Sequence, residues 1–156
     1  MRLMGSAELL VIGAVIVTGA NCGGGSSATP AGPTPGVLQV AGQYRIVQQA
    51  VETTCGDTGA PPAVTGTVTH AAGATSFVLS DTGGTTFTGT VQTTGQFTAT
   101  ATFGPDSAGQ TYTQRLEGRF STTGFTGRLD VDVSPRACRF ARDWTATKQG
   151  SPNTIP

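Results

Sequence analysis

The sequence predicts an all-β domain, an eight-stranded antiparallel barrel of the up-and-down meander type. Between residues 38 and 148 apolar and polar side chains alternate almost throughout, which is the pattern of strands with one buried face. The strands are separated by short turns. Short turns join antiparallel neighbours, because a parallel crossover needs about a dozen residues or a helix.

Eight strands are expected in order, at 39–54, 63–70, 75–81, 85–93, 95–103, 110–121, 124–134 and 136–148. Each boundary from the second strand onward carries residues that favour turns. These separators are Ala72-Gly73, Asp81-Thr82-Gly83-Gly84, Thr94-Gly95, Gly104-Pro105-Asp106, Thr123-Gly124 and Ser134-Pro135. The connectivity is therefore predicted to be a simple meander.

The two faces of the predicted strands differ in chemistry. One face is apolar and holds Phe77, Leu79, Phe87, Val91, Phe97, Ala99, Ala101, Phe103, Tyr112, Leu116, Phe120, Phe125, Leu129, Val131, Val133, Phe140 and Trp144. The opposite face is dominated by threonine, with charged residues such as Arg128 in the later strands. A register slip of one residue would expose every Phe, so the register is strongly specified.

Closure of the sheet is predicted from two cysteines. Cys55 ends the first strand and Cys138 begins the last, and these strands are antiparallel neighbours in a closed barrel. A Cys55–Cys138 disulfide is therefore expected. The alternative is a two-sheet β-sandwich, but Trp144 follows both cysteines, whereas an immunoglobulin-like sandwich has its Trp between them.

The N-terminal segment has the pattern of an export signal. Arg2 precedes the apolar run at 9–17, which is long enough for the core of a signal peptide but too short to span a bilayer. Small residues and Asn21-Cys22 follow it, and 23–36 is rich in Gly, Ser, Pro and Thr. Residues 1–21 are therefore expected to be a signal peptide, and 22–37 a flexible tether.

The residues around Cys22 resemble the lipobox of bacterial lipoproteins, in which a cysteine carries lipid. Ala20 and Cys22 match the lipobox, whereas Gly19 and Asn21 replace a large aliphatic and a small residue. Lipidation of Cys22 leaves Cys55 and Cys138 as one pair of the three cysteines. The resemblance implies an exported protein held at the cell envelope, at the outer membrane or periplasmic side of a Gram-negative cell. Cleavage after Ala20 with soluble secretion and an uncleaved anchor are the alternatives.

A second resemblance concerns the ends of the barrel. Gly42-Gln43-Tyr44 opens the first strand, and Arg142, Trp144 and Lys148 lie on the last. In these positions the chain is similar to lipocalins and avidin-like proteins, where a Gly-x-Trp element is often covered by a basic residue of the last strand. Here Tyr44 stands in place of Trp. The resemblance implies a similar barrel architecture and does not assign a ligand.

The barrel interior is the candidate binding site. Its expected lining residues are Tyr44, Phe87, Phe97, Tyr112, Gln114, Phe140, Arg142 and Trp144. In the period-two alternation, Gln114 and Arg142 fall on the same side as the apolar residues. A polar group buried on that side needs a hydrogen-bond partner. Small inward residues such as Gly66 and Gly118 either leave a cavity for a small apolar ligand or accommodate neighbouring rings.

Composition and side-chain spacing exclude several functions. Nine basic residues balance nine acidic ones, which argues against a nucleic-acid partner. The single histidine, His70, is expected in a surface turn, so neither a metal site nor a cofactor is predicted. Asp130 and Asp132 are expected to face solvent, so no two-carboxylate catalytic site is predicted. The tail 149–156 is expected to be disordered.

These observations predict an exported, membrane-tethered lipoprotein with a non-catalytic barrel and a small apolar ligand. The alternative is a structural or partner-binding module of the cell envelope whose core is filled by its own side chains. The envelope partner in that case is not identified by the sequence.

Overall fold

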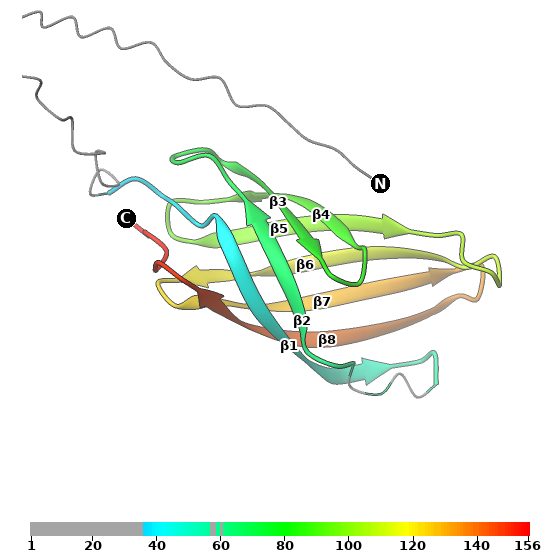
Figure 1. Ribbon diagram of the computed structural model, residues 1–156. Helices are drawn as coiled ribbons and strands as arrows, with labels where there is room; N and C mark the ends of the chain where they lie inside the picture. The colour runs from blue at the N-terminus through cyan, green and yellow to red at the C-terminus, as the bar shows by residue number, and fades with distance from the viewer. Residues whose placement is uncertain (1–35, 57–58, 60) are drawn as a thin grey trace, which may run out of the picture. The chain divides into compact units, whose positions relative to one another are not determined.

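The computed structural model describes residues 36–56, 59 and 61–156, and these form a closed barrel of eight antiparallel strands (Figure 1). The strands are β1 (Gly42–Thr53), β2 (Val64–Thr69), β3 (Ser76–Asp81), β4 (Thr86–Val91), β5 (Gln96–Phe103), β6 (Thr111–Ser121), β7 (Gly124–Ser134) and β8 (Cys138–Gln149). Each strand pairs with the next, and β1 pairs with β8. The predicted up-and-down barrel is confirmed, and the sandwich alternative is excluded.

The predicted signal peptide, Cys22 and nearly all of the predicted tether lie outside the described residues. In the part of the chain that the structure describes, no helix is long and apolar enough to cross a membrane.

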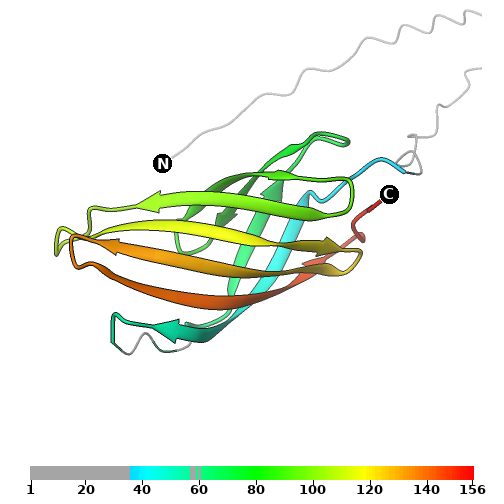
Figure 2. The same ribbon diagram turned by 180° about the vertical axis from the view of Figure 1, so that it is seen from behind.

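Closure depends on a long ladder between the first and last strands. The β1–β8 register runs from Gln43 opposite Gln149 to Thr53 opposite Phe140, with a bulge between Ala50 and Glu52. In contrast, β1 pairs with β2 only from Gly42 to Ile46. Pro61 and Pro62 precede β2 and have no N–H to donate, which accounts for the short pairing on that side. In Figure 2 β5, β6, β7 and β8 form a continuous wall of long ribbons.

The cysteine pair is joined at one end of the barrel. Cys55 and Cys138 form a disulfide with their Cα atoms 5.1 Å apart. The predicted disulfide is confirmed, and it fixes the chain directly after β1 to the first residue of β8. Disulfides persist in oxidising compartments, so the bond supports an exported location.

Small inward-facing residues lie against large ones. Phe77 is opposite Gly89, and Phe97 is opposite Gly118. A Cβ atom added at Gly118 would lie 2.2 Å from the carbonyl oxygen of Thr126 and 2.9 Å from the Phe97 ring. These glycines therefore accommodate neighbouring strands and rings.

Two segments outside the strands cover the end of the barrel opposite the disulfide. Leu38 and Val40 from the N-terminal side are buried, and Gln39 forms an isolated bridge with Thr154. Asn153 in the C-terminal tail is only 4% exposed. The expectation of a disordered tail at 149–156 is wrong, because the backbone and the Asn153 side chain are hydrogen-bonded to the barrel.

His70 also differs from its expected place in a surface turn. It is 6% exposed, with Nδ1 3.1 Å from Gln39 Oε1 and Nε2 2.9 Å from the carbonyl oxygen of Ala74. Nδ1 therefore joins the β2–β3 turn to the segment that precedes β1, whereas the contact of Nε2 lies within the turn itself. The physical reason is that residues 36–41 pack over this turn, a contact that local sequence does not reveal.

Candidate functional site: the open end of the barrel

The inner surface divides into a closed half and an open half. The closed half contains an aromatic cluster of Tyr44, Phe77, Phe97, Phe120 and Phe125. All five side chains are buried, and neighbouring ring centroids lie between 4.8 and 6.1 Å apart. This half of the core is filled by its own rings.

Polar contacts seal the closed end above this cluster. The Tyr44 hydroxyl lies 2.6 Å from the carbonyl oxygen of Val40 and 2.7 Å from Asn153 Oδ1. Lys148 Nζ donates to Asn153 Oδ1 at 2.6 Å and lies 5.4 Å from the centroid of the Tyr44 ring. Burial raises the pKa of Tyr44 above its ordinary value, and burial lowers the pKa of Lys148. The basic residue of the last strand thus covers the aromatic residue of the first.

The disulfide end is the open half. Inward-facing positions at this end keep contact with solvent: Ala50 is exposed, and Tyr112, Gln114, Phe140 and Arg142 are half-buried. Their inward orientation follows from the register, because each lies opposite other inward residues of the neighbouring strands. Solvent therefore reaches the inner surface from this side.

Phe103 lies at the same rim. It was expected in the core, but the residue is 49% exposed. It keeps the inward phase of β5 and contacts the Tyr112 ring, with the centroids 5.9 Å apart. Because Phe103 is the last residue of β5, too few residues lie beyond it at the rim to cover its side chain.

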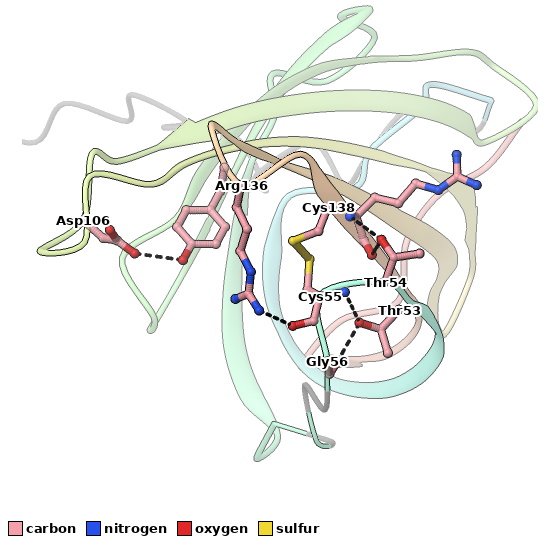
Figure 3. The surroundings of a disulfide bond; sticks show 9 residues. Thr53, Thr54, Cys55, Gly56, Asp106, Arg136 and Cys138 are labelled. Carbon is pink, nitrogen blue, oxygen red and sulfur yellow. Dashed lines mark hydrogen bonds between the residues drawn. A yellow bond between two sulfur atoms is a disulfide. The ribbon is translucent and has the colours of Figure 1, made fainter.

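The rim is organised by local hydrogen bonds. The Tyr112 hydroxyl donates to Asp106 Oδ2 at 2.8 Å, and Arg136 donates to the carbonyl oxygen of Cys55 at 2.8 Å (Figure 3). Hydrogen bonds from the Gln110 N–H and the Tyr112 hydroxyl lower the pKa of Asp106, and the same bond to Asp106 raises the pKa of Tyr112. These contacts hold the turn after β5 and the turn before β8 around the opening.

Polar groups lie on the inner surface below this rim. The Arg142 guanidinium lies 4.9 Å from the centroid of the Phe140 ring, and its Nη1 donates to Gln48 Oε1 at 3.3 Å. Gln48 is only 9% exposed. Burial lowers the pKa of Arg142 below its ordinary value. A positive charge is therefore held on the inner surface and partly shielded from water.

Trp144 lies two residues further along β8. Its indole packs edge-on against Phe87, with the ring centroids 5.7 Å apart, and the residue is 2% exposed. The Nε1 atom is buried and has no hydrogen-bond partner among the described residues. An unsatisfied buried donor is costly in free energy.

The eight predicted lining residues are thus not one site. The structure brings Phe87, Tyr112, Gln114, Phe140, Arg142 and Trp144 to the middle and open part of the barrel, whereas Tyr44 and Phe97 belong to the closed end. Gln48 was missed, although it is a polar residue in the apolar phase of β1. That signal, which identified Gln114 and Arg142, was also present for Gln48.

Other candidate chemistry lies elsewhere. Asp130 and Asp132 are exposed on the outer face, as expected, and Asp130 accepts from Arg128 Nε at 3.1 Å. Among the described residues there is no group of three or more His, Cys, Asp or Glu side chains that could hold a metal ion.

Comparisons with protein-family models, with curated proteins and with solved structures return no significant match. The chemistry of the open half is therefore the basis for assigning a function.

Proposed function

We propose that this chain is an exported, lipid-tethered and non-catalytic β-barrel that binds a small apolar ligand through its open end. The observation that carries the proposal is that inward-facing residues at the disulfide end, such as Ala50 and Arg142, remain in contact with solvent. Apolar walls with a few convergent polar groups are typical of small-molecule sites. Membrane attachment would come from lipid on Cys22, followed by a segment rich in Gly, Ser and Pro.

Binding is tested with N-phenyl-1-naphthylamine, a neutral apolar probe whose fluorescence rises in apolar surroundings. We expect saturable binding with a stoichiometry near one. Ala50→Phe should abolish it, because the new ring would occupy the opening. Val47→Phe is the matched control, since Val47 is 44% exposed and its side chain is on the outer face of the same strand. No saturable binding by the wild-type protein would rule out the carrier function.

The second candidate is a structural or partner-binding envelope module with a self-filled core. The aromatic cluster and the tightly approached glycines of the closed half favour it. Absence of probe binding together with retention at the membrane would support this alternative.

Attachment is tested separately by Cys22→Ala. The variant should move from the membrane fraction to the soluble fraction. If it remains with the membrane, lipidation of Cys22 is not the anchor.

A further inference from the structure

We propose that the Cys55–Cys138 disulfide is a redox-sensitive switch that, when oxidised, holds the end of β1 against β8. When a dithiol reduces the bond, residues 47–56 separate from β8 and the open end of the barrel widens. The inference goes beyond the proposed function, because it concerns the barrel itself and is tested without a ligand. If the chain binds a ligand as proposed, the switch would control access to the open end.

The first argument is that the second half of β1 is paired on one side. In the described part of the chain, β1 pairs with β2 only as far as Ile46, whereas its pairing with β8 continues to Thr53. A bulge between Ala50 and Glu52 interrupts this remaining ladder. Residues 49–54 are all exposed, so burial of their side chains does not fix them to the core. Segments with few buried contacts and exposed backbone hydrogen bonds are those that open locally.

The second argument is that the contacts beside the disulfide are weak. The Thr54 N–H donates to the carbonyl oxygen of Arg139 at 2.8 Å, and the Arg139 N–H donates to Thr54 Oγ1 at 2.9 Å. Arg139 also pairs with Glu52 at 3.5 Å, and both side chains are exposed. Hydrogen bonds and ion pairs in contact with water contribute little to stability. The covalent bond therefore supplies most of the attachment of this segment to β8.

The third argument is that a reductant can reach the disulfide. Both cysteines are half-buried at the rim rather than enclosed in the core. Arg136 donates from Nη2 to the carbonyl oxygen of Cys55 at 2.8 Å, which holds a positive charge beside this cysteine (Figure 3). A nearby positive charge favours the thiolate that leaves when a disulfide is cleaved.

The reaction is thiol–disulfide exchange. One thiolate of the dithiol attacks a sulfur atom of the bond, which forms a mixed disulfide and releases the other cysteine as a thiolate. The second thiolate of the dithiol then displaces the remaining cysteine. Cys55 and Cys138 each take up a proton, and the dithiol, which loses two protons and two electrons, becomes a disulfide itself.

Hydrogen–deuterium exchange of the full-length chain tests the switch, before and after reduction with dithiothreitol. Short labelling times are used, so that local opening and not global unfolding determines the exchange. Amides of residues 47–56 should exchange about tenfold faster in the reduced protein, while amides of β5 and β6 stay protected. Cys55→Ser combined with Cys138→Ser should reproduce the reduced state.

Two controls separate the switch from other effects. Asn153→Ala removes hydrogen bonds at the opposite end but keeps the disulfide, so residues 47–56 should exchange as in the oxidised wild-type protein. Arg136→Gln should slow reduction of the native protein about threefold, because the positive charge beside Cys55 is lost. Arg119→Gln is its matched control, since Arg119 also donates to a backbone carbonyl, that of Thr94 at 3.1 Å, but at the closed end.

Three results would overturn the proposal. Equal exchange of residues 47–56 in the oxidised and reduced proteins would show that the disulfide does not hold this segment. Faster exchange of all strands at short labelling times would show that reduction unfolds the barrel. A disulfide that dithiothreitol reduces only in urea would not be a switch of the native protein. None of these results bears on ligand binding, which the naphthylamine probe tests separately.

Discussion

Substitution of Asn153 by Ala is predicted to open the closed end of the barrel. Asn153 Nδ2 donates to the carbonyl oxygens of Ser121 at 2.7 Å and Gly124 at 3.3 Å. Its Oδ1 accepts from Tyr44 and from Lys148. The side chain therefore connects the C-terminal tail to β1, β6, β7 and β8, and its removal leaves several buried groups without this partner.

The expected loss is about 3 kcal/mol of unfolding free energy. A neutral hydrogen bond contributes about 1 kcal/mol net and one to a charged group about 2 kcal/mol. The sum falls to this value for two reasons. The single hydrogen of the Tyr44 hydroxyl is shared between two acceptors, Val40 O and Asn153 Oδ1, and the 3.3 Å bond to the Gly124 carbonyl oxygen is too long to contribute much. If the unfolding free energy falls by about 2 kcal/mol per M of urea, the urea midpoint of unfolding should fall by about 1.5 M.

Urea unfolding followed by Trp144 fluorescence measures this shift. Ser151→Ala is the matched control, because Ser151 lies in the same tail but is exposed, and its midpoint should equal that of the wild-type protein. A loss below about 1 kcal/mol in Asn153→Ala, with an unchanged urea dependence, would refute the role of the tail as a structural cap.

Two further predictions concern the whole barrel. Replacing Cys55 and Cys138 together by Ser should lower the unfolding free energy by up to about 4.5 kcal/mol, since the bond joins residues 83 apart. Equal urea midpoints for the variant and the oxidised wild-type protein would contradict this. The pKa values of the two tyrosines, Tyr44 and Tyr112, are both raised above 10.0. The native protein should therefore show less phenolate absorbance at pH 10 than the urea-unfolded chain, in which the tyrosines should be about half ionised. Because the folded pKa values are the higher ones, stability should fall as the pH rises above about 10, and early phenolate absorbance in the native protein would contradict the burial of Tyr44.

Strand order and the inward face were predictable because both follow from local sequence. A strand alternates its side chains with period two, so the phase of Phe77, Leu79 and Phe87 identifies the inner surface without knowledge of its neighbours. Short turns then leave a meander as the natural connectivity. The positions of the two cysteines added one long-range constraint, and this constraint favoured a closed barrel over a two-sheet sandwich.

The candidate site was less predictable. The alternation of residues shows which side chains face inward, but it does not show how deeply each one is buried. Tyr44 and Arg142 both face inward, yet Tyr44 is fully buried at the closed end while Arg142 is half-buried near the opening. This difference in burial depends on where the neighbouring strands end and on which segments cover each end of the barrel. Gln48 was overlooked although it carries the same signal as Gln114.

By itself, the chain's alternation of residues determined which side chains point inward and which point to solvent, since that choice is made within each strand. Which end of the barrel is sealed was decided by contacts between distant segments, namely Leu38 and Val40 before β1 and Asn153 after β8. These short segments have no periodicity. Their burial arises only when the closed sheet offers carbonyl groups and aromatic rings for them to cover.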